Sequence, residues 1–437
     1  MLKEYLKTHT DVINSNEEIS INNRSNNIEL SAIVYEYKWE NKDNHNMTAV
    51  TYSFKQSISQ EYHYYRLKND GPISALNQWQ ISQTRIAMQS ISDVANIRFI
   101  EVNESVNANI PIVNVHPEQP ISAAGYARLP GGADNLSPVC INADFSENLT
   151  PTRSNYGGRV FTHEIMHALG LKHTHDTVRL TQQKSVMSYY SEWYSDADYA
   201  GHYASTPQLY DIAALQYLYG PNMSTRTGND IYTYSSHAPI LCIWDADGID
   251  TLDFSHQTQD QVINLTSGSC SNIGGLKGNI SIAYGVVIEN AIGGSGNDQL
   301  WGNKEVNVLA GGDGDDKLSG GNGADHLWGG KGNNTFIYHH TEDSLTTSAD
   351  TIHDFKSGED KIDLSPLIYG NEDIALVDKF SFSGQTEIMQ KYDEVRDITY
   401  LMVDFDNKRH EADMMIKLTG KHQLTLNNFI INPLLTT

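Results

Sequence analysis

HEIMHALGLKH, residues 163–173, places three histidines within eleven residues. His163 and His167 are four residues apart, so on a helix their imidazoles project from one face and can reach the same tetrahedral ion. Gly170 can adopt the positive φ that a turn needs here, and the turn would bring His173 back toward the pair. Three neutral histidines leave the fourth position of a zinc ion open to water, so the stretch predicts a catalytic zinc site.

Two further residues complete the predicted site. Glu164 lies beside the histidines, where it can take a proton from an attacking water and deliver it to a leaving amine. Met187, in SVMSY at residues 185–189, is expected to form a hydrophobic floor beneath the metal without binding it. HExxH occurs by chance in unrelated helices, but the extended string followed by this methionine is far more restrictive. We therefore predict peptide hydrolysis, and we disfavour an ordinary amphipathic helix with surface histidines.

These motifs resemble the metzincin clan of zinc proteases, and SVMSY is similar to its serralysin and astacin branches. The resemblance implies a metzincin protease domain that acts on protein or peptide substrates. It also implies a role for Tyr189, which would cap the resting zinc and then stabilise the oxyanion of the tetrahedral intermediate.

Five nine-residue units run in register from Gly293 to Ile337: GGSGNDQLW, GNKEVNVLA, GGDGDDKLS, GGNGADHLW and GGKGNNTFI. They follow the pattern GGxGxDxUx, in which the glycines form a tight turn and expose carbonyls, the aspartate supplies a carboxylate and the apolar eighth residue enters a core. Each unit is expected to form half a coil of a parallel β-roll that binds Ca²⁺. The unbroken register disfavours a flexible Gly-rich linker, and the repeats resemble the RTX repeats of the serralysins.

Calcium ions are expected between turns eighteen residues apart, because alternate units stack on the same side. Asp298 then pairs with the turn of Asp316, and Asp316 with the turn of Asn334. The second unit has lost its glycine pair and carries Asn307, so the site it shares with Asp325 should be weak or vacant. The calcium ligands predicted in the repeats are Gly294, Gly296, Asp298, Gly312, Gly314, Asp316, Gly321, Gly323, Asp325, Gly330, Gly332 and Asn334.

A second group of acidic residues lies upstream, around IWDADGIDTLDFS at residues 243–255. This stretch and Arg226-Thr227-Gly228 resemble the junction between protease and β-roll in serralysins, which implies calcium sites there. On chemistry alone the acids form a plausible oxygen-rich turn, with solvated surface acids as the alternative. The predicted ligands are Arg226, Gly228, Asp230, Asp245, Asp247, Gly248 and Asp250.

The chain has 30 Lys plus Arg against 54 Asp plus Glu, a formal net charge of −24. This charge argues against binding to nucleic acid or anionic membranes and fits a protein that needs cations to fold. No stretch approaches 18 apolar residues, and the N-terminus lacks the apolar core of a secretory signal. The serralysin resemblance implies an extracellular monomer, exported from a Gram-negative bacterium by a type I secretion apparatus that reads an uncleaved C-terminal signal, with a small periplasmic inhibitor protein as a further partner.

The predicted fold class is α+β, with a metzincin zinc-protease domain followed by an all-β parallel β-roll. Residues 1–48 are expected to be a propeptide or a disordered extension, 49–220 the protease, and 221–437 the calcium-binding roll and C-terminal secretion region. Strands are predicted at 50–54, 98–102 and 110–115. Residues 124–130 are expected to be an edge strand above the cleft, where a substrate adds as an antiparallel strand.

Two helices are predicted on either side of the zinc motif. The first should open at Pro72 and Ser74, with core residues at Leu76, Trp79, Ile86 and Val94. The second should be capped by Thr206-Pro207 and end at Gly220. The three cysteines, Cys140, Cys242 and Cys270, do not indicate a disulfide framework, and a Cys242–Cys270 bridge stays open.

Two departures from the family bear on substrate and export. His173-Thr174-His175-Asp176 stands where serralysins commonly have His-Pro-Gly, and the path to Met187 is short, so substrate specificity should be shifted. His175 is expected to be solvent-exposed, the alternative being competition for zinc. The chain finishes with NPLLTT after Asn428–Ile431, unlike the usual family ending.

A rival interpretation of the whole chain is a calcium-dependent adhesive module with a narrow or vestigial protease half. The physiological role also stays open: it could be nutritional, virulence-related or the processing of one partner.

Overall fold

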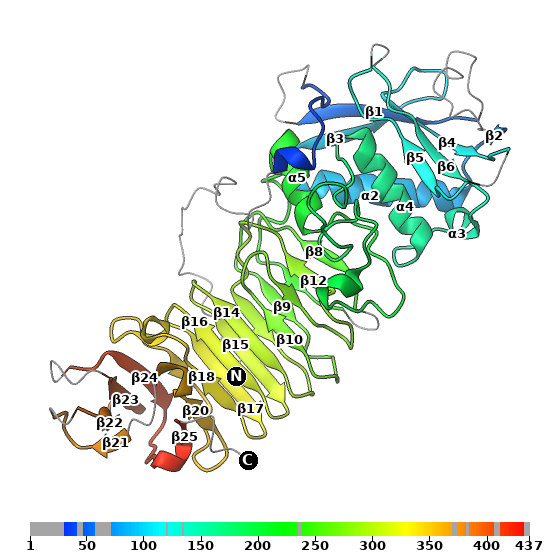
Figure 1. The fold of residues 1–437 in the computed structure, drawn as a ribbon. Helices are drawn as coiled ribbons and strands as arrows, with labels where there is room; N and C mark the ends of the chain where they lie inside the picture. The colour runs from blue at the N-terminus through cyan, green and yellow to red at the C-terminus, as the bar shows by residue number, and fades with distance from the viewer. Residues whose placement is uncertain are drawn as a thin grey trace.

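The computed structural model describes residues 30–41, 47–56, 71–118, 121–132, 135–234, 238–368, 374–381, 384–405 and 411–431. Figure 1 shows helices packed on a sheet in the first half of the chain and a long β-roll in the second half. This arrangement confirms the predicted α+β class and the β-roll. Most of the expected propeptide and the last six residues of the predicted secretion region lie outside the described residues.

The sheet of the first half has the strand order β3-β1-β4-β6-β5, with β2 also paired to β4. β5 lies at its edge and pairs with β6 in the antiparallel direction, as predicted for residues 124–130. The three strands predicted at 50–54, 98–102 and 110–115 are confirmed to within two residues. The strand bounds are β1 Thr48–Phe54, β2 Ile73–Ser74, β3 Ile97–Glu101, β4 Ile110–Val115, β5 Gly125–Ala127 and β6 Val139–Asn142.

The helices of this half are α2 Gln78–Val94, α3 Ser146–Leu149, α4 Tyr156–Ala168 and α5 Leu209–Tyr219. α2 begins four residues later than predicted because Asn77 caps it, with Asn77 Oδ1 accepting the Gln80 N–H at 3.0 Å. Pro72–Ser74 leads instead into strand β2.

Two details of the helix predictions are wrong. Trp79 is 67% exposed and Ile86 is half-buried, so neither belongs to the core, because both lie on the side of α2 away from its buried residues. α5 is capped by Gln208, since the Asp211 carboxylate accepts the Gln208 N–H at 2.9 Å. The helix ends at Gly220 as expected.

The β-roll consists of two long sheets of mostly parallel strands that face each other (Figure 1). One sheet contains β10 Val262–Asn264, β14 Gln299–Asn303, β16 Lys317–Gly321, β18 Thr335–Ile337, β20 Lys361–Asp363 and β25 Phe429–Ile430, in that order. The other contains β7 Ile231–Tyr232, β9 Thr251–Asp253, β13 Asn290–Ile292, β15 Val308–Asp313, β17 His326–Lys331, β19 Thr351–Ile352, β24 Met414–Thr419, β23 Ile398–Asp404, β22 Thr386–Asp393 and β21 Ile374–Val377. Strands β24 and β25 continue the two sheets beyond the repeats, so the C-terminal region extends the roll.

Alternate repeat units stack in register, as the eighteen-residue pairing predicts. Leu300 lies opposite Leu318, which lies opposite Phe336, and Leu309 lies opposite Leu327 on the other sheet. All five side chains are at most 1% exposed. The apolar eighth position of each unit therefore forms the thin core between the sheets.

A small third sheet separates two of the cysteines. Cys242 on β8 Leu241–Ile243 and Cys270 on β11 Cys270–Ser271 both pair with Ser281, on opposite sides of β12 Ile280–Ile282. Two strand spacings are about 9–10 Å, more than a disulfide can span. All three cysteines are free, so the Cys242–Cys270 bridge does not form. In the described part of the chain, no helix is long and apolar enough to cross a membrane.

Candidate active site

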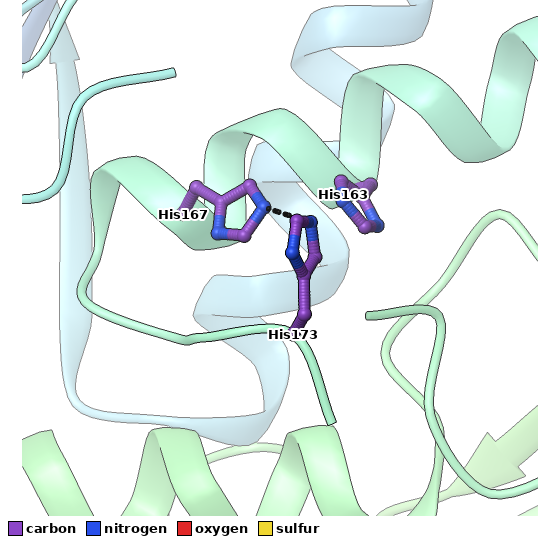
Figure 2. A group of neighbouring side chains, drawn as sticks. All are labelled: His163, His167 and His173. Carbon is purple, nitrogen blue, oxygen red and sulfur yellow. Dashed lines mark hydrogen bonds between the residues drawn. The ribbon is translucent and has the colours of Figure 1, made fainter. Parts of the chain in front are cut away.

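Helix α4 and the turn after it position the three histidines. Asn155 caps the helix by accepting the Gly158 N–H at 2.9 Å, and the helix ends at Ala168. Gly170, at φ +105°, then reverses the chain as predicted, and the Leu171 N–H donates back to the Met166 carbonyl at 3.0 Å. Figure 2 shows the result: His163 and His167 project from the helix toward His173 on the returning segment.

The three imidazoles form a group whose nitrogens lie within 4.8 Å of one another. Nδ1 of His163 donates to the Val186 carbonyl at 2.8 Å, and Nδ1 of His167 donates to the Leu171 carbonyl at 2.7 Å. These bonds fix the tautomer, so Nε2 of each ring is a lone-pair donor, and Nε2 of His167 lies 3.0 Å from Nε2 of His173. Three Nε2-type donors around one point fit the ligand set of zinc.

Burial keeps these histidines neutral, as metal binding requires. It lowers the pKa of His163 well below the usual value and that of His167 to about 4, with neighbouring histidines acting in the same direction. Burial also lowers the pKa of His173, helped by His175.

Glu164 lies in a closed environment beside the histidines. Its side chain is buried, and Oε2 has no hydrogen-bond partner among the described residues. Burial raises the pKa of Glu164 to about 8, against the opposing effect of Arg159. Gly125 on β5 covers it from above: a Cβ there would lie 2.9 Å from Glu164 Cγ and 3.0 Å from Oε1. A buried, unpartnered carboxylate under an edge strand is positioned to exchange a proton with a small molecule such as water.

The segment around Met187 contacts the site, because the Val186 carbonyl accepts the His163 Nδ1–H, and the hydrophobic floor expected at Met187 stays a prediction. Met187 is fully buried. Asp211 of α5 holds this segment, because its carboxylate accepts the Ser185 hydroxyl at 2.6 Å and the Val186 N–H at 2.8 Å. The buried Arg159 guanidinium donates to the Val186 and Ser188 carbonyls. The sequence analysis did not identify Arg159 and Asp211 as residues that hold the Met187 segment, since neither belongs to a recognisable motif.

Tyr189 lies at the mouth of the site. Its ring centroid is 5.8 Å from that of His163 and 4.7 Å from that of His173, and burial raises the pKa of its phenol, as does the charge of Glu164. His175 stacks on Tyr189 with centroids 4.3 Å apart, and its Nδ1 accepts the Tyr189 N–H at 3.2 Å. The His175 side chain is only 16% exposed, so the expectation of a free surface histidine is wrong.

Residues 30–41, expected to belong to the N-terminal extension, contact the turn between His167 and His173. The Tyr35 N–H donates to the Gly170 carbonyl at 2.7 Å, and the Lys172 N–H donates to the Ile33 carbonyl at 2.9 Å. Trp39 Nε1 donates to the Ala168 carbonyl at 2.8 Å, and the Trp39 side chain is buried. This segment therefore braces the backbone that carries the third histidine.

The carboxylates predicted at the junction come together in part. Oxygens of Asp230, Asp245 and Asp250 lie within 4.8 Å of one another. Burial raises the pKa of Asp250 to about 8, and the charges of Asp245 and Glu289 act in the same direction. Burial also raises the pKa of Asp245, with the charge of Asp230 adding to it, which fits a site that a cation would neutralise. Asp247 is exposed and lies outside this group.

The backbone groups predicted at the junction lie beside these carboxylates. The Arg226 carbonyl accepts the Ala246 and Asp247 N–H groups. A Cβ on Gly248 would lie 2.1 Å from the Gly228 carbonyl oxygen, so only glycine fits there.

In the roll, predicted ligands and four residues that were not predicted, Gln261, Glu289, Asp350 and Asp360, form two ladders of side chains. Except for Gln261, Asp230 and Asn307, each rung accepts, through one oxygen, the backbone N–H of the equivalent residue one coil earlier, at 2.7–3.1 Å. One ladder contains Gln261, Asp298, Asp316, Asn334 and Asp360. The other contains Asp230, Asp250 and Glu289, and further along Asn307, Asp325 and Asp350.

Three of the carboxylates in these ladders have a second oxygen without a hydrogen-bond partner among the described residues. Oδ2 of Asp316, Asp325 and Asp350 is buried without a hydrogen bond from any described residue. Burial raises the pKa of Asp316 to about 7 and of Asp325 to about 8. Orphaned buried oxygens of this kind fit Ca²⁺, which takes six to eight oxygen ligands. The predicted glycines Gly294, Gly296, Gly312, Gly314, Gly321, Gly323, Gly330 and Gly332 lie in the turns and strand ends beside them.

Comparisons with known proteins agree with this geometry. The family described as "Peptidase M10 serralysin C terminal" matches residues 210–431. Serralysin A of Dickeya chrysanthemi is 42% identical over 371 residues, which cover 79% of this chain and 78% of the relative. The chain belongs to the serralysin family. Metalloprotease AprA of Pseudomonas entomophila (strain L48) is 36% identical over 422 residues, covering 89% and 86%, and a serralysin of Proteus mirabilis is 38% identical over 424 residues, covering 85% of each chain.

Sequence reasoning about this serralysin-family chain missed two rungs beyond the repeats, Asp350 and Asp360. The signal was present: DTI at 350–352 and DKI at 360–362 repeat the D-x-U core of the nonapeptides, although the glycine pair that opens the pattern is absent before both. Gly125 had no such signal, because its role depends on the approach of Glu164 from another element.

Proposed function

We propose that this chain is a secreted zinc endopeptidase in which Glu164 is the general base and calcium stabilises the β-roll. The observation that carries the proposal is the joint arrangement of three clustered histidines, two of them anchored on backbone carbonyls, and a buried, unpartnered carboxylate beneath an edge strand. His163, His167 and His173 would hold the zinc, which when bound would activate water and polarise the scissile carbonyl. The family relatives along most of the chain are proteases, so the adhesive-module alternative is not favoured.

Strand β5 orients the substrate in this mechanism. It pairs with β6 on one side, so its other edge can accept an extended peptide as an antiparallel strand. Gly125 lies directly over Glu164, so the paired peptide would pass above the carboxylate.

Two side chains then handle the protons. Glu164 takes a proton from the attacking water and passes it to the leaving amine. Tyr189, whose raised pKa keeps its phenol protonated, donates a hydrogen bond to the developing oxyanion.

Calcium would be held by the two ladders and by the junction carboxylates, neutralising charges that otherwise repel in a chain of net charge −24. Type I export, a small periplasmic inhibitor, a monomeric state and the domain limits at residues 48 and 220 are proposed from the family and the sequence pattern. Millimolar extracellular calcium would fill even weak sites, so folding would be completed after export.

The test is digestion of an unfolded protein such as casein in millimolar calcium, with and without a zinc chelator. Glu164→Gln is the matched control, because it removes the base and keeps the ligands and the volume. We expect cleavage by the wild type, and its loss by a factor of about 10²–10⁴ in Glu164→Gln with zinc content and fold unchanged. Near-full activity of Glu164→Gln would overturn the assigned mechanism.

A further inference from the structure

Two histidines of neighbouring strands lie side by side on the outer face of the β-roll. His326 is the first residue of β17, and His353 directly follows β19. Their neighbours Leu327 and Ile352 pair with each other and are at most 1% exposed, so both belong to the core between the sheets. Because side chains alternate along a strand, His326 and His353 point away from that core. Both side chains are partly exposed to solvent.

The two imidazoles have the spacing of adjacent metal ligands. Nδ1 of His326 lies 2.9 Å from Nε2 of His353. Two imidazole nitrogens that bind one ion at about 2.0–2.1 Å lie about 2.8–3.4 Å apart, depending on the angle at the ion. In the candidate active site, Nε2 of His167 lies 3.0 Å from Nε2 of His173. The pair on the roll therefore matches the pair at the zinc site, although a hydrogen bond between two neutral rings gives the same distance.

A tryptophan holds the two rings in place. Trp328, also on the outer face of β17, stacks on His353 with centroids 3.9 Å apart and ring planes inclined by 5°. The Trp328 ring centroid lies 6.4 Å from that of His326. The backbone is fixed as well, because the His353 N–H donates to the Leu327 carbonyl at 2.9 Å. Ligands that are ordered before binding lose little further conformational entropy when an ion arrives.

The chemistry of the two ligands selects the ion. Imidazole nitrogens suit divalent transition metals, whereas Ca²⁺ takes oxygen ligands, so the calcium of the roll would not compete for this pair. Among the divalent first-row metals, Cu²⁺ binds a given nitrogen site most tightly, and water can complete its coordination. The formal net charge of −24 also favours the approach of a cation.

We propose that His326 and His353 form a binding site for a divalent transition-metal ion, with Cu²⁺ as the preferred ion. The ion would connect β17, in the fourth repeat unit, to the segment after β19, which lies beyond the repeats. At this step the eighteen-residue spacing ends, because the ladder rungs Asp325 and Asp350 are 25 residues apart. Metal binding would therefore stabilise the boundary between the repeats and the C-terminal strands, independently of the proposed protease function.

The experiment titrates Cu²⁺ into the full chain loaded with calcium and zinc, and follows binding by calorimetry and by tryptophan fluorescence. Bound Cu²⁺ quenches a nearby indole, so emission from Trp328 should fall. The test variants are His326→Gln and His353→Gln, because glutamine keeps a hydrogen-bonding side chain but lacks the imidazole ligand. The matched control is His339→Gln/His340→Gln, which removes two exposed histidines shortly after β18 in the same roll. Circular dichroism reports the folding of each variant.

We expect the wild type to bind one Cu²⁺ ion that each single variant binds at least about 10- to 100-fold more weakly, since even a residue that only orients a ligand contributes that much. The control should keep the wild-type affinity. Cu²⁺ should also raise the melting temperature of the wild type more than that of the two single variants.

Two further results separate this site from other copper binding. Trp328→Phe should keep the calorimetric signal and lose the quenching. Exchange of copper for the zinc of the candidate active site would occur equally in all variants, so the difference between wild type and His353→Gln reports the pair alone. Equal Cu²⁺ affinity in the wild type and in both folded single variants would overturn the proposal and leave the pair as a hydrogen bond.

Discussion

The two predicted metal-binding regions are built in opposite ways. The zinc site is local: its three histidines lie within eleven residues, and two backbone carbonyls hold two of the rings with their lone pairs facing inward. The ladders of the roll are non-local, because each rung needs a partner at least eighteen residues away. Neutral histidines can gather without a metal, whereas stacked carboxylates repel one another until a cation arrives. The first region should therefore be preformed, and the second should depend on its ion.

The largest expected effect of this difference is on folding without calcium. Removing calcium should unfold the roll, because each site contributes about 2.7 kcal/mol when calcium is at 100 times its Kd, and several sites act together. Circular dichroism at pH 8, with and without calcium, measures the loss of β-structure. A roll that keeps its full β-signal in calcium-free buffer would contradict the comparison.

The same carboxylates predict a pH dependence. Without calcium, burial raises the pKa of Asp316 to about 7 and of Asp325 to about 8 in the folded chain, against about 4 when unfolded. Between pH 4 and 8 the folded form thus binds more protons, so its stability falls as pH rises. Calcium requires ionised carboxylates, so the stabilisation by calcium should grow over that window. Melting curves at pH 5, 6.5 and 8 test this, and equal calcium effects at all three would refute it.

In the preformed region, a further prediction distinguishes two roles of Tyr189. Tyr189→Phe keeps the ring on His175 but removes the phenol hydrogen-bond donor. If the bond forms in the transition state, kcat should fall about 10- to 100-fold with little change in KM. Equal effects on kcat and KM would indicate that Tyr189 only covers the resting metal. Tyr190→Phe, next in the chain, is the control for the conservative change.

The local zinc site was largely predictable from sequence, and the ladders only in part. Helix periodicity and one glycine place His163, His167 and His173 without knowledge of the fold, and the structure brings them together. The nonapeptide pattern gave the eighteen-residue pairing, but Asp350 and Asp360 follow it at intervals of 25 and 26 residues, which a fixed period cannot reveal. Gly125 and Trp39 act through contacts with distant segments, and no spacing in the sequence encodes those contacts.

A smaller effect is expected from one of the non-local contacts that support the zinc site. Trp39→Phe keeps an aromatic ring in the buried site but removes the indole N–H that donates to the Ala168 carbonyl. Loss of this bond destabilises the zinc-binding conformation of the turn that carries His173 by about 1 kcal/mol, so zinc affinity should fall about fivefold. Competition with a chelator measures it, and Trp79→Phe, on the exposed face of α2, is the control. Unchanged zinc affinity would mean that the turn keeps its conformation without this bond and that residues 30–41 only cover it.

The effect confined to a single calcium site tests whether an amide can replace a cation in the ladder. Asn307 satisfies its own site: Oδ1 accepts the Asn303 N–H at 2.7 Å, and Nδ2 donates to the Glu289 carbonyl at 3.0 Å. Asn334, by contrast, has a buried Nδ2 without a partner among the described residues. Asn307→Asp would remove the Nδ2 donor of Asn307 and leave a carboxylate near Asp325.

In chelator, Asn307→Asp should destabilise the chain by about 1–3 kcal/mol, the cost of an unsatisfied buried group. In calcium it should bind one additional ion and recover that loss, as measured by calcium titration calorimetry and melting temperature. Asn322→Asp adds the same charge at an exposed position of the neighbouring unit and should change neither. If Asn307→Asp gains no calcium, the amide is not a substitute for the ion. The missing glycines of the second unit would then prevent calcium binding there. Charge repulsion alone would in that case not explain why the roll depends on its ion and the zinc site does not.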